Sequence, residues 1–265
     1  MMHTKPSVLA VVLTITLVCF AVLTATGQQA MSPENNEYYA AMETVANLTE
    51  QGRLNQALTA LQQAEPPAEL AFEHWYNIGV LQYDLAKFAE STETFQRAVE
   101  LNDDHENARF NLAASLLQDG RYEESLVQLD RLLEQTDGYS IRLKRGNAFY
   151  ALGEYSRALI EYGAAVKLHP TNADAYYNLA NIQYDNEDFL LAEQNYSQAL
   201  QIDDGFTEAR FNRANTRMHM ELYEKALEDY RHILNHAPDD EDAAFNARLA
   251  EQMLNAPIEQ QGENE

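Results

Sequence analysis

The chain has 265 residues, of which 46% are hydrophobic, so it holds enough apolar side chain for a sizeable core. Acidic residues outnumber basic ones by 42 to 18, and the net charge is −24. This balance argues against nucleic acid and anionic lipid head groups as partners, because affinity for them rests on phosphate contacts made by Lys and Arg. The one cysteine, Cys19, lies near the N-terminus, so the rest of the chain has no thiol for a disulfide, a thiolate metal site or a nucleophile.

The N-terminal segment has the pattern of an export signal. An uncharged apolar run at residues 8–25 follows Lys5, and the small residues Ala25 and Gly27 fit a signal-peptidase site. Residues 1–27 are therefore predicted to be a signal peptide cleaved after Gly27. The alternative is an uncleaved membrane anchor, because the run reaches the lower length limit for a spanning helix. Both predict export: the protein is periplasmic or secreted if cleaved, and otherwise membrane-anchored with its remaining residues outside the cytoplasm.

Beyond this segment the sequence repeats at intervals of 33 or 34 residues. In the five copies from Phe72 onward, position 8 is small, whereas positions 17 and 24 are large and mostly aromatic; the first copy has Val45 at position 8. Two apolar 3.6-residue periods separated by a turn predict one helix over positions 1–14 and a second over positions 18–30. A single hairpin cannot bury this much apolar surface, so the copies are expected to stack.

The predicted segments follow from this numbering. They are a linker at 28–37, helix hairpins near 38–71, 72–105, 106–138, 139–172, 173–206 and 207–240, a capping helix at 241–254, and a disordered acidic tail at 255–265.

The residues at the recurring positions fit a known motif. The strongest matches are Trp75-x2-Ile78-Gly79 with Phe95 and Ala98, and Gly146-x2-Phe149 with Ala158, Tyr162, Ala165 and Pro170. The sequence resembles the tetratricopeptide repeat (TPR) family, of the exported bacterial envelope type. The resemblance implies an all-α, right-handed α-solenoid of about six hairpins plus a capping helix, with the first helices lining an inner groove. It also implies a non-enzymatic scaffold or adaptor for protein partners in the cell envelope.

In that family, positions 2, 5, 9, 12 and 13 face the groove and position 6 lies near its edge. Asparagine recurs at positions 6 and 9 of this chain, and tyrosine at positions 5 and 12. An asparagine side chain both donates and accepts hydrogen bonds, so a row of them suits the backbone of an extended peptide. The alternative is that these asparagines bond only within the array. The predicted groove residues are Asn77, Asn111, Asn147, Asn178, Asn181, Asn212, Asn215, Tyr76, Tyr150, Tyr177 and Tyr184.

The charges near the predicted groove favour a neutral or basic peptide segment. Acidic residues such as Asp174 and Asp185 stand at positions 2 and 13. Family members that bind acidic chaperone C-termini carry Lys and Arg at positions 2, 5 and 6, where this chain has Lys144 alone. A second hypothesis is a small-molecule or peptide carrier or sensor that uses the same groove.

Two copies carry an arginine at position 7, and the same two carry an acid at position 23. This coincidence predicts structural ion pairs between the two helices of a hairpin, Arg145 with Glu161 and Arg213 with Asp229. An anion-binding site is the alternative.

The sequence shows no set of residues typical of an enzyme. His232 and His236 share one helix face, but no third ligand accompanies them, and no phosphate loop or nucleophile elbow occurs. No cofactor, metal or catalytic residue is predicted, and the protein is expected not to be an enzyme.

Overall fold

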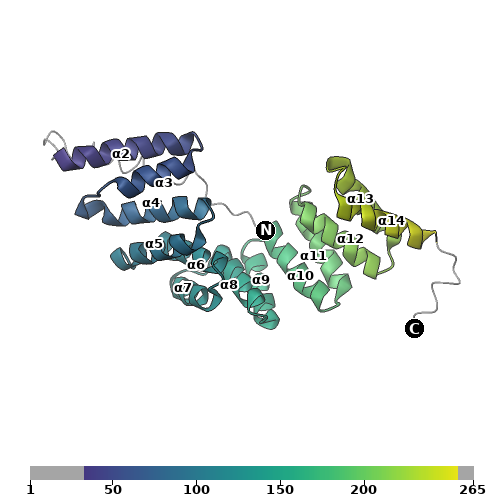
Figure 1. The fold of residues 1–265 in the computed structure, drawn as a ribbon. Coiled ribbons are helices and arrows are strands. Elements are labelled where there is room, and N and C mark those ends of the chain that lie inside the picture. Colours follow the sequence, from purple (N-terminus) through teal and green to yellow (C-terminus); the bar gives the residue numbers. More distant parts are fainter. Residues whose placement is uncertain (1–32, 256–265) are drawn as a thin grey trace. The chain divides into compact units, whose positions relative to one another are not determined.

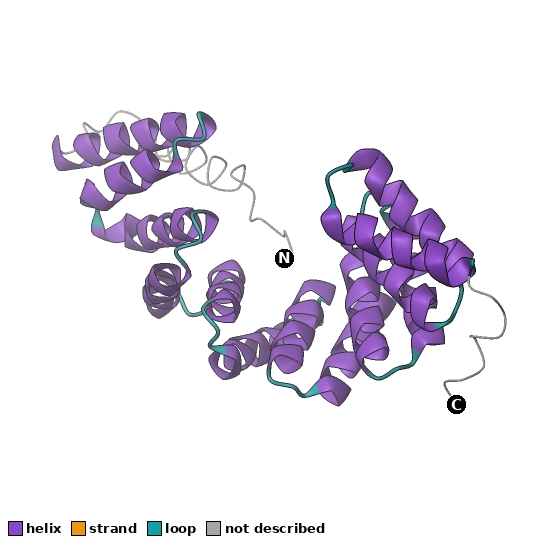
Figure 2. Ribbon diagram, turned by 45° about the vertical axis from the view of Figure 1, so that its right-hand side comes forward, coloured by secondary structure: helices purple, strands orange, loops and turns teal. Residues whose placement is uncertain are grey.

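The computed structural model describes residues 33–255, with side chains from residue 37 onward. All regular elements in this range are helices, which confirms the predicted all-α fold of helix hairpins ending in one additional helix (Figures 1 and 2). The predicted signal peptide or anchor at 1–27 and the acidic tail beyond residue 255 lie outside the described residues. Among the helices that are described, none has the length and apolar character needed to cross a membrane.

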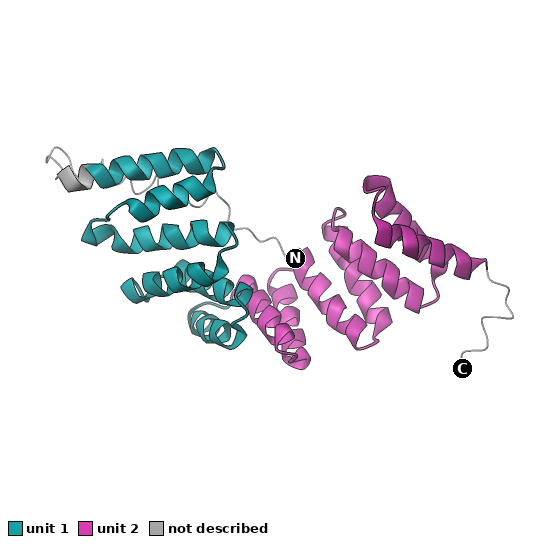
Figure 3. Cartoon of the chain, in the orientation of Figure 1, with its two compact units in different colours: residues 1–137 teal, residues 138–265 magenta. Residues whose placement is uncertain are grey.

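The chain divides into two compact units with the boundary between Asp137 and Gly138 (Figure 3). The helices of the first unit are α2 (Pro33–Glu50), α3 (Leu54–Gln63), the short 3-10 helix η1 (Ala68–Leu70), α4 (Ala71–Asp84), α5 (Phe88–Leu101), α6 (Glu106–Gln118) and α7 (Tyr122–Gln135). Those of the second unit are α8 (Tyr139–Ala151), α9 (Tyr155–Leu168), α10 (Ala173–Asp185), α11 (Phe189–Ile202), α12 (Thr207–His219), α13 (Tyr223–His236) and α14 (Glu241–Leu254).

The first hairpin differs from the prediction at both of its helices. Helix α2 begins at Pro33, so residues 33–37 are helical and do not belong to the predicted linker at 28–37. Proline is well suited to a first helical turn, because the N–H that it lacks would have no partner there. Helix α3 ends at Gln63, shortly before Pro66 and Pro67, because a proline cannot continue a helix and favours extended backbone in the residue before it.

Within each hairpin, small residues stand where the two helices approach and large ones fill the space beside them. A Cβ added to Gly79 would lie 2.8 Å from Cε1 of Phe95, closer than carbon atoms pack. The alanines that take the same position in other copies, Ala113, Ala180 and Ala214, have no exposed surface. The large residues at position 24 are almost completely buried; they are Phe95, Leu129, Tyr162, Tyr196 and Tyr230.

The turn inside each of the six hairpins repeats one backbone motif. Position 15 has positive φ in every copy; the residues are Gly52, Ala86, Gly120, Gly153, Glu187 and Glu221. In the second copy, the N–H of Ala86 donates to the carbonyl oxygen of Tyr83 and the N–H of Lys87 to that of Gln82, each at 2.9 Å. These are the two bonds of a Schellman motif, which ends the first helix by satisfying its last carbonyl groups.

Ala86 adopts this left-handed conformation at φ 58°, although an L side chain is disfavoured there. We expect Ala86→Gly to raise the free energy of unfolding by about 0.5–1 kcal/mol, because glycine relieves the strain and the exposed alanine gives up no packing. Ala40→Gly is the matched control, since Ala40 is equally exposed but lies inside helix α2; it should lower the free energy of unfolding by about 1 kcal/mol. Urea denaturation followed by circular dichroism measures both, and a loss of stability in both variants would contradict the strain argument.

Candidate functional site

In the second unit, the asparagine at position 9 of each hairpin accepts a hydrogen bond from a buried tyrosine of the same hairpin. Asn147 Oδ1 accepts from the hydroxyl of Tyr162 at 2.8 Å. The two following hairpins repeat this contact at 2.7 Å, from Tyr196 to Asn181, and at 2.6 Å, from Tyr230 to Asn215. Burial raises the pKa of all three phenols, so each stays protonated and donates.

Each of these hairpins is linked to the next helix by an asparagine at position 6 of that next helix. Asn178, Asn212 and Asn246 donate through Nδ2 to Oδ1 of the asparagine at position 9 in the copy before, at 3.4, 3.2 and 3.4 Å. Asn212 also donates to the hydroxyl of Tyr177 at 3.3 Å. We call the set Asn147, Asn178, Asn181, Asn212, Asn215 and Asn246, with the three buried tyrosines, the polar ladder.

The polar ladder uses only one end of two of its amides. Oδ1 of Asn181 and of Asn215 accepts two hydrogen bonds each, whereas their Nδ2 groups have no partner within the described part of the chain. Both side chains are half-buried and line a cavity of about 190 Å³. The cavity is lined by Asn181, Tyr184, Asp185, Asn212 and Asn215, so the structure brings together four of the predicted groove residues and one acid.

A second row of polar contacts runs beside this cavity, from position 12 of one copy to position 13 of the next. The hydroxyl of Tyr150 donates to Oδ2 of Asp185 at 3.0 Å, and the hydroxyl of Tyr184 lies 2.9 Å from Nε2 of His219. Burial and the negative charge of Asp185 raise the pKa of Tyr150 to about 12. His219 is not among the predicted groove residues, because no other copy has a histidine at position 13 and no pattern marks it.

The predicted groove residues of the first unit are arranged differently. Asn111 donates through Nδ2 to the hydroxyl of Tyr76 at 3.1 Å. Asn77 has no exposed surface, so it does not line a groove, and both atoms of its amide lack a hydrogen-bond partner. The reason lies in the copy before it, where Met42 and Ala46 stand at positions 5 and 9 and offer no side-chain oxygen. Asn178 is also a correction to the predicted groove, since it is only 4% exposed.

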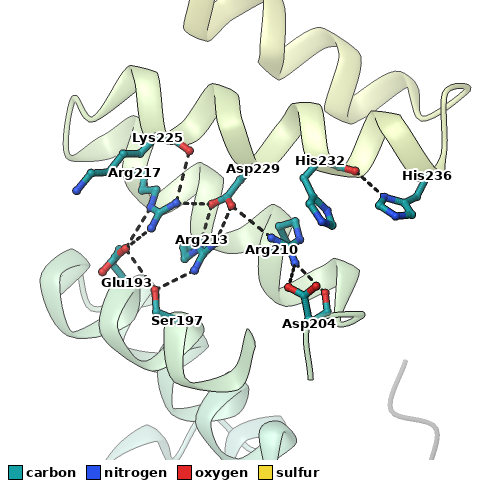
Figure 4. Close-up of polar contacts among 10 residues, drawn as sticks. All are labelled: Glu193, Ser197, Asp204, Arg210, Arg213, Arg217, Lys225, Asp229, His232 and His236. Carbon is teal, nitrogen blue, oxygen red and sulfur yellow. Dashed lines mark hydrogen bonds and ion pairs between the residues drawn. The ribbon is translucent and has the colours of Figure 1, made fainter. Parts of the chain in front are cut away.

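Both predicted ion pairs form in the structure. The pair between Arg213 and Asp229 is part of a larger network of charged side chains (Figure 4). Arg145 and Glu161 are in contact at 2.8 Å, and Arg142 adds a second contact to the same carboxylate at 3.1 Å. Arg213 donates two hydrogen bonds to Asp229, from Nε at 2.9 Å and from Nη2 at 2.6 Å.

The Asp229 carboxylate is 4% exposed and also accepts from Arg217 at 2.7 Å. Arg217 in turn contacts Glu193 of α11 at 2.7 Å, and Arg213 donates to the hydroxyl of Ser197 at 3.1 Å, so the network ties α13, α12 and the hairpin before them. Arg210 forms a further ion pair with Asp204 at 2.6 Å. Because these arginines are engaged by carboxylates, the network fits a structural role and not the alternative of an anion-binding site.

His232 and His236, which the sequence places on one face of a helix, stack on each other in α13. The ring centroids of His232 and His236 are 4.8 Å apart, and Nδ1 of His236 lies 2.9 Å from the carbonyl oxygen of His232. No group of three or more His, Cys, Asp or Glu residues placed to hold a metal ion occurs in residues 33–255.

Family models match much of the helical region. Residues 76–140 and 173–205 match models described as tetratricopeptide repeat, and residues 146–187 match one described as TPR repeat. In these segments the chain is similar to tetratricopeptide repeats. Of the hairpins that carry the polar ladder and the cavity, α10–α11 lies inside the matched segments, whereas α12–α13 lies beyond them.

Known proteins share the repeat but differ in extent. The chain is 25% identical over 182 residues to Hsp70-Hsp90 organizing protein 1 of Glycine max, a match that covers 64% of this chain and 30% of that protein. It therefore spans about a third of the length of this relative. MamA of Desulfovibrio magneticus RS-1 superposes with a TM-score of 0.59 at 17% identity, covering 67% of this chain and 99% of that one. TTC0263, a TPR protein of Thermus thermophilus, gives a TM-score of 0.55 at 23% identity, covering 68% and 98%. The two structures share the fold.

The charge network predicts unequal losses on either side of one ion pair. Asp229→Leu should lower the free energy of unfolding by about 3–5 kcal/mol, because it removes the shared partner of two largely buried arginines. Arg213→Met should cost less, about 1–3 kcal/mol, because Arg217 still donates to Asp229. The double variant should recover part of the Asp229→Leu loss. Urea denaturation measures all three, and a double variant whose loss equals the sum of the two single losses would exclude a coupled pair.

The amide of Asn77 is buried without a hydrogen-bond partner, so replacing it with an apolar side chain of the same branched shape should increase stability. Asn77→Leu should raise the free energy of unfolding by about 1–3 kcal/mol, because it removes two buried polar atoms that have no partner. Asn212→Leu, at the same position of another copy, should instead be destabilising, since that amide donates to Tyr177 and Asn181. Thermal and urea denaturation distinguish the two; equal effects would show that the ladder bonds contribute nothing.

Proposed function

We propose that the chain is a non-enzymatic scaffold that binds an extended, neutral or basic peptide segment of a protein partner along α10 and α12. One observation carries the proposal: the Nδ2 groups of Asn181 and Asn215 stand one repeat apart beside a cavity and have no partner in the described part of the chain. A free amide N–H is a donor for a peptide carbonyl oxygen and asks for no particular side chain.

The two interpretations of the asparagines are compatible when the ends of each amide are considered separately. The oxygen of Asn181 is held by Tyr196 and Asn212, which fixes the orientation of the amide. The same contacts leave Nδ2 available to a ligand. The structural role of the ladder therefore prepares the donors that a peptide would use.

The size of the cavity favours a peptide over the small-molecule carrier or sensor. Sites for drug-sized ligands enclose about 300–1,000 Å³, whereas this cavity encloses about 190 Å³. It is large enough for one side chain of a segment whose backbone lies along the helices. A protein partner is also in keeping with the name of the soybean relative, which mentions two proteins, the chaperones Hsp70 and Hsp90. An acidic peptide is disfavoured at this cavity, because no Lys or Arg lines it.

The location of the protein is part of the proposal. The apolar run at residues 8–25 supports export, with residues 1–27 acting as a signal peptide or as a membrane anchor. The partner would then be a protein of the cell envelope, and the net charge of −24 favours partners with neutral or basic segments.

The double variant Asn181→Asp with Asn215→Asp tests the free donors directly. An aspartate keeps the oxygen that accepts from the buried tyrosine but replaces the free NH2 group with a second oxygen. We expect partner capture to fall about tenfold or more, measured by in-cell cross-linking with mass spectrometry on the full-length chain, because two donors to the ligand are lost.

The control is Asn102→Asp with Asn235→Asp, which adds the same charge at two exposed asparagines that do not line the cavity. It should capture the same proteins as the parent chain, and circular dichroism should show that all three chains remain helical. Envelope proteins are the expected partners. Equal capture by the parent and the cavity variant would overturn the binding site, and capture of cytoplasmic proteins alone would overturn the location.

A further inference from the structure

The last turn of α10 supplies the cavity with a carboxylate that has no basic partner. Asp185 lines the cavity and accepts a hydrogen bond from Tyr150 at 3.0 Å through Oδ2. In the part of the chain that the structure describes, no Lys, Arg or His forms an ion pair with it. A carboxylate at a helix C-terminus also adds to the negative end of the helix dipole, so the site attracts cations.

The arginines nearest in sequence on α12 do not neutralise this charge. Arg210, Arg213 and Arg217 are held by Asp204, Asp229 and Glu193 at 2.6, 2.6 and 2.7 Å (Figure 4). The residues that follow α10, Glu187 and Asp188, add two exposed negative charges. The cavity therefore combines a negative potential with neutral amide donors.

One wall of the cavity is aromatic and fixed in place. The ring of Tyr184 lies edge-on to that of Phe189, with centroids 5.6 Å apart, and its hydroxyl is 2.9 Å from Nε2 of His219. Burial and the charge of Asp185 raise the pKa of Tyr184, so the phenol is neutral at pH 7. An aromatic face next to a carboxylate suits a side chain with an apolar stem and a cationic end.

We propose, on the basis of the peptide-binding function above, that this cavity is a specificity pocket for a lysine or arginine side chain of the bound segment. The stem of that side chain lies against Tyr184 and its cation pairs with Asp185. Asn181 and Asn215 hold carbonyl oxygens of the flanking backbone. The asparagines thus give affinity that is independent of sequence, and Asp185 selects the residue at one position of the peptide.

The test compares side chains of similar length with and without charge. The probe is a series of fluorescent nine-residue peptides with randomised neutral flanks and a central lysine, arginine, norleucine or glutamate. Binding to the full-length protein is measured by fluorescence anisotropy at low ionic strength. We expect the lysine and arginine peptides to bind about fivefold more tightly than the norleucine peptide, the size of effect typical of an ion pair that remains partly in water. Added salt should reduce the preference.

Asp185→Asn isolates the charge, because the amide oxygen can still accept from Tyr150. This variant should bind lysine and norleucine peptides equally, with the norleucine affinity unchanged. Asp188→Asn is the matched control, since it removes one exposed charge that does not line the cavity, and it should keep the fivefold preference.

The outcomes separate this inference from the proposed function. Equal binding of lysine and norleucine peptides by the parent chain would overturn the pocket and leave peptide binding standing, as would a preference that survives in Asp185→Asn. Failure of the parent chain to bind any peptide of the series would overturn the peptide-binding function itself.

Discussion

A buried hydroxyl must form a hydrogen bond, and in the second unit this requirement determines where the asparagines lie. Tyr162, Tyr196 and Tyr230 fill the space between paired helices, and each directs its hydroxyl to an asparagine at position 9. In the first unit, position 24 is Phe95 or Leu129, and position 9 is Val80 or Ala114. Tyrosine at position 24 and asparagine at position 9 therefore occur together or not at all in these five copies. Two of the residues that line the cavity, Asn181 and Asn215, are therefore a consequence of how the core is filled.

Both units join successive copies by polar contacts as well as by apolar packing. In the first unit these contacts include the hydrogen bonds between Ser91 and Ser115 and between Asn111 and Tyr76. In the second unit, the polar ladder repeats its contacts over three hairpins, and the arginine network adds the contact between Glu193 and Arg217. Hydrogen bonds and ion pairs fix geometry more narrowly than apolar contact does, which suits the unit that carries the candidate site.

The sequence predicted the features that depend on residue type and spacing. Periodicity gave the helix hairpins, and the shared occurrence of arginine at position 7 and acid at position 23 indicated which side chains lie together. It did not predict that Arg210 and Arg217 also reach Asp229. Arginine at position 4 accompanies a glutamine at position 23 as well as an acid, and Arg217 at position 11 has no counterpart in the other copies. The sequence also left the role of the asparagines open, because a sequence does not show which end of an amide is bonded. It predicted a turn in each hairpin but not the left-handed residue in it, because Ala86, Glu187 and Glu221 stand where other copies have glycine.

The doubly bonded oxygens of Asn181 and Asn215 have a consequence for the cost of recognition. A free side chain loses rotational entropy when a ligand immobilises it, and this loss reduces the affinity gained from each new bond. Here folding has already immobilised the two amides, through contacts with Tyr196 and Asn212 on one and Tyr230 and Asn246 on the other. Their separation is set by the stacking of helices and not by the ligand. A peptide that binds as proposed would therefore have to present its carbonyl groups at the spacing of these two amides.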